Sequence, residues 1–166
     1  VVLDHSGYRK IHKALYECVV DMGNIGPDYI PGHAHSDTFN FELYIKEKPF
    51  IVDTGTSTYE INNKRSEQRS TKAHNTVMIN DTEQSEVWSG FRVAARAKVY
   101  NFLEGEDYMS AQHDGYEKNL NAVHQREFFF KEDSIKIVDT IHADLEYEAV
   151  ARIHFAPGVT IEKKED

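Results

Sequence analysis

The sequence predicts an all-β protein, a two-sheet antiparallel β-sandwich with little helix. Apolar and polar residues alternate with a period of two along several short segments, as expected for strands that bury one face. Turn-forming pairs such as Asp114-Gly115 and Pro157-Gly158 separate these segments. Helical periodicity is weak, and its best stretch, 10–16, fits a strand equally well.

The strongest strand pattern lies at 39–45, where every second residue is Phe, Leu or Ile. A turn at Glu47-Lys48-Pro49 ends it and the apolar strand 50–53 follows, so a hairpin is predicted with Asp53 at its far end. The stretch 62–72 is polar and is predicted to be a long loop. Further strands are predicted, in order, at 76–79, 92–102, 108–112, 121–130, 135–141 and 149–155.

The chain has the length and charge of a single acidic domain. With 166 residues, 1–166 are expected to form one domain with one sizeable core. Nineteen Lys and Arg against 28 Asp and Glu give a formal net charge of −9, which argues against nucleic acid or an anionic membrane as a partner. No apolar run approaches the roughly 18 residues of a membrane span. The single cysteine, Cys18, is expected to be a buried small hydrophobe.

Several residues of the types that bind metal ions lie in the first half of the chain. His33 and His35 are two apart, so an extended strand would direct both imidazoles to one face, and Asp37 continues that face. Asp53 ends the hairpin, and His74 closes the polar loop. Two imidazoles and one carboxylate suit zinc, although ligand type alone also admits nickel or manganese.

Cupins, small metal-binding jelly rolls, offer a competing explanation for a His-x-His strand. Their pattern places a Glu ligand about four residues after the second His, whereas the first Glu after His35 is Glu42. The sequence therefore fails the cupin pattern at a ligand.

Five successive segments carry a family resemblance instead. They are Pro31–Asp37, Phe39–Leu43, Val52–Thr56, Arg69–Thr71 and Ala73–Val77. In this order they resemble the heparinase II/III-like sandwich domain, and the likeness extends over roughly residues 6 to 160.

The resemblance implies a function and a partner domain. Proteins of that family degrade uronic-acid-containing polysaccharides, glycosaminoglycan-like or alginate-like, by β-elimination. Their sandwich packs against a preceding (α/α) helical toroid, and they are usually exported to the periplasm or secreted. No toroid is present here, so we expect 1–166 to be part of a longer lyase and inactive alone. Because of the net negative charge, an acidic polysaccharide needs a local basic groove or basic groups from the helical domain.

The resemblance also assigns roles to individual residues. It implies that His35, Asp53 and His74 hold a metal, commonly zinc, and that His33 faces the substrate cleft as the catalytic candidate. Histidine suits either proton-transfer step or charge stabilisation, and the sequence leaves the choice open. The metal is expected to serve mainly to orient the site.

Further polar side chains are candidates for substrate contact. Arg69 and Asn75 are predicted to bind substrate, and Arg65 is an equivalent arginine candidate. The alternatives are solvated loop positions for the two arginines and a turn-capping role for Asn75. Trp88 could stack on a sugar or pack on the sandwich. The rival hypothesis for the whole chain is a non-catalytic carbohydrate-binding or structural sandwich stabilised by metal.

Overall fold

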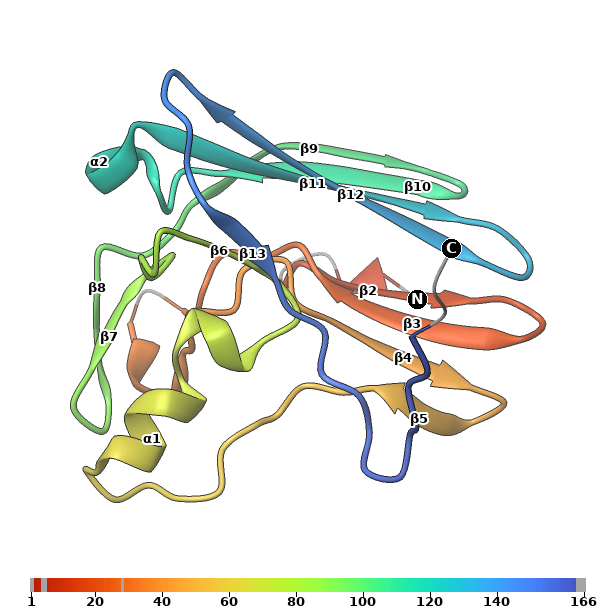
Figure 1. The fold of residues 1–166 in the computed structure, drawn as a ribbon, viewed down its shortest axis with the longest axis horizontal. Helices are drawn as coiled ribbons and strands as arrows, with labels where there is room; N and C mark the ends of the chain where they lie inside the picture. Colours follow the sequence, from red (N-terminus) through yellow and green to blue (C-terminus); the bar gives the residue numbers. More distant parts are fainter. Residues whose placement is uncertain (1, 4–5, 28, 164–166) are drawn as a thin grey trace.

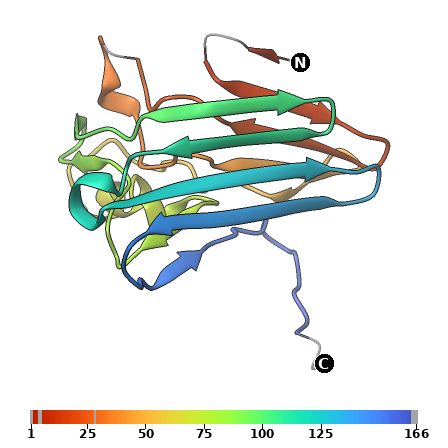
Figure 2. The ribbon, with the colours of Figure 1, turned by 90° about the horizontal axis from the view of Figure 1, so that it is seen from above.

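The computed structural model describes residues 2–3, 6–27 and 29–163, and two antiparallel sheets form its layers (Figure 1). The first sheet has the order β1-β2-β3-β4-β5. The second has the order β12-β11-β10-β9, and Figure 2 shows its four long strands side by side. The predicted two-sheet antiparallel sandwich is therefore confirmed. The strands of the two sheets are Val2–Leu3 (β1), Tyr8–His12 (β2), Tyr16–Asp21 (β3), Phe41–Ile45 (β4), Lys48–Ile51 (β5), Val99–Gly105 (β9), Tyr108–His113 (β10), Ala122–Phe130 (β11) and Ile135–Ala143 (β12).

Smaller elements lie at one end of the sandwich. They are the strand pair Val77–Ile79 (β6) and Ala149–Ala151 (β13), the hairpin Glu86–Trp88 (β7) and Arg92–Ala94 (β8), the helices Asn63–Gln68 (α1) and Glu117–Leu120 (α2), and the 3-10 turns Pro31–His33 (η1) and Thr71–Ala73 (η2). Among the described residues, no helix is long and apolar enough to span a bilayer.

The core fills the space between the two sheets because alternate residues of each strand face inward. On β3 every second side chain is buried, Cys18 among them, and β11 repeats this alternation over nine residues. Phe41 and Phe128, from opposite sheets, meet edge to face at 5.7 Å between ring centroids. The expected burial of Cys18 is confirmed.

The structure decides one segment that the sequence left open and divides another that was predicted as a single strand. The stretch 10–16 does not form a helix and instead contributes to the β2–β3 hairpin. The predicted strand 92–102 is divided into β8 and β9, and Ala95 between them has a left-handed φ of 41° that interrupts extended pairing.

The predicted long loop 62–72 is also wrong, because it contains α1 and most of η2. Asn62 caps α1 by accepting a hydrogen bond from the Arg65 backbone N–H at 2.9 Å. The residues buried in this region, Arg65, Arg69, Ser70 and Thr71, are all polar, so the helix has no apolar stripe that hydrophobic periodicity would detect.

Candidate metal centre

The His-x-His segment is not a strand. His33 ends the 3-10 turn η1, and Ala34 and His35 follow in irregular backbone. The two imidazoles therefore enter different surroundings. His33 is exposed, and its ring packs edge to face with those of Tyr59 and Phe91, at 5.7 and 5.6 Å between ring centroids. His35 turns toward His74, with 5.2 Å between ring centroids.

Three potential ligands come together behind this segment. One ligand atom each from His35, Asp37 and His74 lies within 4.8 Å of the others. The Oδ2 atom of Asp53 lies 2.6 Å from His74 Nδ1. The structure thus groups two of the predicted ligands, His35 and His74, with Asp37, and it places the third, Asp53, in contact with His74.

The environment of His74 fits a metal ligand. Its side chain is fully buried, and its Nε2 atom has no hydrogen-bond partner among the described residues. Its Nδ1 atom faces the Asp53 carboxylate, the usual arrangement behind a metal-bound imidazole. A buried ring nitrogen without a partner is costly, and a cation at Nε2 would remove that cost.

The Asp53 carboxylate has several partners at once. Its Oδ2 accepts a hydrogen bond from Asn40 Nδ2 at 2.6 Å, and its Oδ1 accepts one from the Gly55 backbone N–H at 2.6 Å. With His74 Nδ1 on Oδ2, Asp53 orients the imidazole of His74. Asp53 remains a predicted ligand, and Asp37 is the carboxylate that the geometry groups with both histidines.

The electrostatics of the group favour a cation. Burial, reinforced by His74, lowers the pKa of His35 to about 4, so its imidazole is neutral and its lone pair available near pH 7. Burial raises the pKa of Asp37 to about 6. Burial opposes the charged form of His74, but the hydrogen bond to Asp53 and the nearby Asp37 outweigh it and raise the pKa of His74. The same negative charges that favour a proton there favour a metal ion.

Of the candidate ligands, all but the fully buried His74 line a large cleft. Its volume is about 1050 Å³, and its lining includes His33, His35, Asp37 and Asp53. The only Lys or Arg among the described lining residues is Arg9, which donates to both carboxylate oxygens of Glu104. The cleft itself therefore supplies little positive charge for an anionic ligand.

Arg69 is buried and binds backbone rather than facing the cleft. Its Nε and Nη2 atoms both donate to the Ala34 carbonyl, at 3.1 and 3.0 Å, and further donors reach the carbonyls of Ser89 and Arg92. Ala34 lies between His33 and His35, so Arg69 holds the His-x-His segment in place. Direct substrate binding by Arg69 stays a prediction that this burial does not support.

Asn75 is likewise fully buried and connects three backbone segments. Its Nδ2 donates to the carbonyls of Phe41 and Val52 at 2.8 and 3.0 Å, and its Oδ1 accepts from the His154 N–H at 2.7 Å. All three of these side-chain hydrogen bonds of Asn75 are made to backbone groups, and none is directed to the cleft. Its predicted substrate role is untested, and its contacts are structural.

Arg65 organises the aromatic groups around His33. The guanidinium lies over the rings of Tyr59 and Phe91 at 5.2 and 5.4 Å and donates to the Gly90 carbonyl at 3.1 Å. Both rings are about half exposed and stack on each other at 6.1 Å. Trp88, on β7, is 46% exposed, which is compatible with either of the roles considered for it.

Two further residues that act on the site were not singled out from the sequence. Asn40 bonds Asp53 and, through its Oδ1, the Asn75 backbone N–H at 2.9 Å. Arg126 donates to the Asn75 carbonyl at 2.6 Å. Their partners are 13, 35 and 51 residues away in the sequence, so local spacing carries no signal for them.

Comparisons with known proteins agree with this fold. The family model described as "Heparinase II/III-like, C-terminal" matches residues 1–166. The structure of a protein described as "Heparinase III-BT4657 gene product, Methylated Lysines" is similar with a TM-score of 0.69 at 19% identity, covering 100% of this chain and 26% of that one. Heparan sulfate lyase HepC from Pedobacter heparinus matches with a TM-score of 0.62 at 21% identity, covering 84% of this chain and 21% of that one. No curated protein matches the chain.

Proposed function

Because the chain belongs to the heparinase II/III-like C-terminal family, we propose that it forms the sandwich part of a polysaccharide lyase. The chain spans only about a quarter of the solved lyase structures it resembles. The proposed reaction is β-elimination on a uronic-acid-containing polysaccharide, glycosaminoglycan-like or alginate-like. The observation that carries the proposal is that exposed His33 lines the same cleft as His35 and Asp37, which form one group with the buried His74.

The reaction needs three contributions. The uronate carboxylate must be neutralised so that a base can remove the proton at C5. The electron pair then forms the C4–C5 double bond as the C4–O bond breaks, and an acid protonates the departing oxygen. Within this cleft His33 is the exposed imidazole placed for one of the proton steps or for stabilising charge on the substrate.

The metal centre that we propose beside His33 is held by His35 and His74 with Asp37 or Asp53. Zinc is the preferred ion because two imidazoles and a carboxylate are a common zinc set. A bound cation would add positive charge next to the substrate carboxylate. The protein's own part is to hold the His-x-His segment: Arg69 fixes Ala34, and the rings of Tyr59 and Phe91 contact His33.

A helical domain is the proposed partner for substrate binding. The described cleft lining holds Asp21, Asp37, Glu42 and Asp53 against one arginine, so an anionic chain needs further cations from outside this sandwich. Burial raises the pKa of Asp21 to about 7, which removes part of that negative charge near neutral pH. We therefore propose that 1–166 is inactive alone, and that the whole protein works in the periplasm or outside the cell.

The test uses the full-length protein that carries this domain and follows the ultraviolet absorbance of unsaturated uronate. Heparan sulfate is assayed first, then chondroitin-like and alginate substrates. His33→Ala should lower kcat at least 100-fold, the usual contribution of one proton-transfer group. His12→Ala changes an exposed histidine that ends β2 and does not line the cleft; it is the matched control and should keep full activity.

Metal analysis separates the lyase from its rival. One zinc per chain, lost in His74→Ala and retained in His12→Ala, supports the proposed centre. A full-length protein that binds zinc yet releases no unsaturated uronate from any of the substrates favours the non-catalytic, metal-stabilised module instead. Absence of any bound metal in the wild type contradicts the centre.

A further inference from the structure

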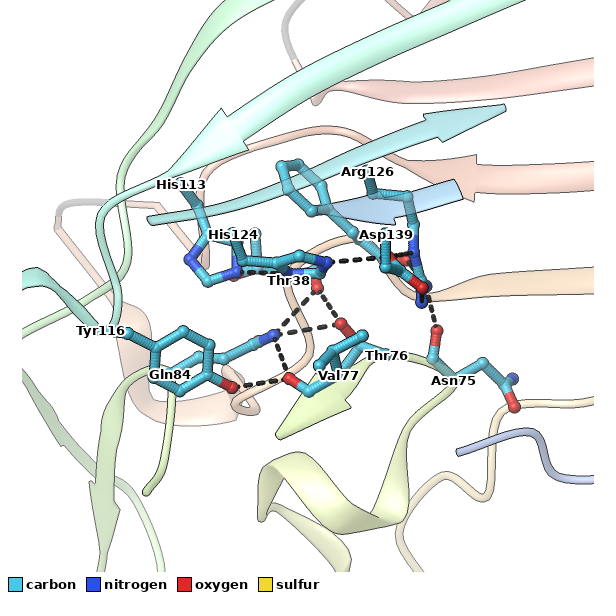
Figure 3. A network of polar contacts seen from close by, with 11 residues as sticks. Thr38, Asn75, Thr76, Val77, Gln84, His113, Tyr116, His124, Arg126 and Asp139 are labelled. Atoms are coloured by element: carbon cyan, nitrogen blue, oxygen red, sulfur yellow. Dashed lines mark hydrogen bonds and ion pairs between the residues drawn. The ribbon is translucent and has the colours of Figure 1, made fainter. Parts of the chain in front are cut away.

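A partly buried ion pair, with its arginine fully enclosed, lies behind the loops that carry the candidate ligands. Arg126 on β11 and Asp139 on β12 are directly paired across the second sheet. Arg126 Nε lies 2.7 Å from Asp139 Oδ1 and Nη2 lies 2.9 Å from Oδ2, a two-pronged contact (Figure 3). Only 2% of Arg126 is exposed. The fork geometry fixes the plane of the guanidinium as well as its position.

The remaining nitrogen of Arg126 reaches out of this sheet to two loops. Nη1 donates to the Phe39 carbonyl at 2.9 Å and to the Asn75 carbonyl at 2.6 Å. Phe39 has a left-handed φ of 67°, a strained backbone state that surrounding contacts must maintain. Asp37 is two residues before Phe39, and His74 is adjacent to Asn75. One guanidinium thus ties both ligand-bearing loops to the second sheet.

A continuous line of hydrogen bonds leads on to the candidate ligands. The Asn75 N–H donates to Asn40 Oδ1 at 2.9 Å, and Asn40 Nδ2 donates to Asp53 Oδ2 at 2.6 Å. That oxygen lies 2.6 Å from His74 Nδ1. A displacement of the Asn75 carbonyl would therefore change the orientation of His74 through groups already in contact.

Two buried histidines hold Asp139 from its other side. The Gly115 N–H donates to His113 Nδ1 at 3.1 Å, which places the His113 proton on Nε2. That proton is donated to His124 Nδ1 at 3.1 Å, and the His124 Nε2 proton is donated to Asp139 Oδ1 at 2.8 Å. Every donor in this line meets an acceptor with both rings neutral, and Figure 3 shows the line ending at the ion pair.

We propose that Arg126 and Asp139 are positioning residues for the metal centre, acting on His74 and Asp37 through the carbonyls of Asn75 and Phe39. This inference rests on the proposed function, since it assumes that a cation binds there. It predicts that metal affinity depends on a charged pair located in the opposite sheet.

The main experiment measures the zinc dissociation constant by competition with a chromophoric chelator, together with the urea unfolding midpoint. Arg126→Gln should raise the dissociation constant at least tenfold, the usual effect of removing a group behind a metal ligand. Asp139→Asn should raise it less, because the amide keeps one acceptor for the guanidinium. Phe130→Ala is the stability control, because Phe130 is a core residue on the same strand, β11, and bonds neither loop. Its urea unfolding midpoint should fall, while its zinc dissociation constant should stay within twofold of wild type.

A second readout needs no metal. In metal-free wild type His74 Nδ1 lies 2.6 Å from Asp53 Oδ2, and the proton between them should give a protected low-field proton NMR signal. Arg126→Gln should lose that signal to exchange with water, while Phe130→Ala should keep it. If Arg126→Gln does not fold, Arg126→Lys, which keeps the charge and loses the fork, takes its place in both measurements.

The outcomes distinguish the two proposals. Wild-type zinc affinity and a wild-type His74 signal in folded Arg126→Gln overturn the positioning role. An equal loss of affinity in Phe130→Ala overturns it as well, because general destabilisation then explains the effect. If the wild type binds no zinc, the metal centre is wrong, and the His74 signal still decides whether Arg126 positions that side chain.

Discussion

Asn75→Ala should destabilise the fold far more than an ordinary polar-to-alanine substitution. The fully buried amide side chain bonds three backbone groups, the carbonyls of Phe41 and Val52 and the N–H of His154; the first bond is buried and the other two are partly buried. Alanine leaves all three without that partner. A buried group left unpaired costs about 1–3 kcal/mol and a partly buried one less, so the expected loss is about 3 kcal/mol. A loss of this size is a large share of the about 5–15 kcal/mol that stabilises a typical domain.

The free energy of unfolding is measured by urea titration of Asn75→Ala against wild type. Asn119→Ala, an exposed asparagine on α2, is the control and should change stability by no more than about 0.5 kcal/mol. An unfolding midpoint of Asn75→Ala equal to wild type would refute the structural reasoning. If that variant also lost lyase activity while keeping its stability, the substrate-binding role predicted from the sequence would be restored.

Two further predictions concern buried groups away from the ligands. Burial lowers the pKa of His113, and the positive charge of Arg126 and of protonated His124 lowers it further. Burial also lowers the pKa of His124. These two rings therefore bind more protons in the unfolded chain than in the native one in mild acid. The stability that these two rings contribute should be complete above about pH 6.5 and be lost below it, by up to about 1.4 kcal/mol per pH unit for each ring. Asp21 and Asp37, whose raised pKa values act in the opposite direction, are common to wild type and His113→Gln, so urea titrations of both from pH 7 to pH 5 isolate the histidine contribution, and equal slopes contradict it. Burial raises the pKa of the Cys18 thiol to about 12, so iodoacetamide should label it only on unfolding, and rapid labelling of the native protein at pH 8 would contradict its position in the core.

The sequence predicted strands correctly where one face of the strand is buried and the other is more exposed. On β11 burial alternates over all nine residues, which is the pattern that period-two hydrophobicity detects. The same method failed at α1 because the buried side chains there are Arg65 and Arg69, whose burial depends on carbonyls and aromatic rings supplied by other segments.

The candidate ligands were predicted as residue types, and their arrangement was only partly predictable. His35, Asp53 and His74 were expected together; the structure groups His35 and His74 with Asp37 and places Asp53 against Nδ1 of His74. The expected extended His-x-His strand is wrong, because a 3-10 turn ends at His33 and separates the two imidazoles. Asp37 joins the group through this irregular backbone, which no periodicity describes.

Local order along the chain was enough to establish the all-β class, most strand positions and the residues with metal-binding chemistry. Each of those inferences depends on neighbours a few residues apart. The partners of each carboxylate, and the enclosure of Arg69, Asn75 and Arg126, depend on packing between segments far apart in the sequence. Arg126 meets Asn75 across 51 residues and Phe39 across 87, so these contacts exist only once the two sheets have closed on each other.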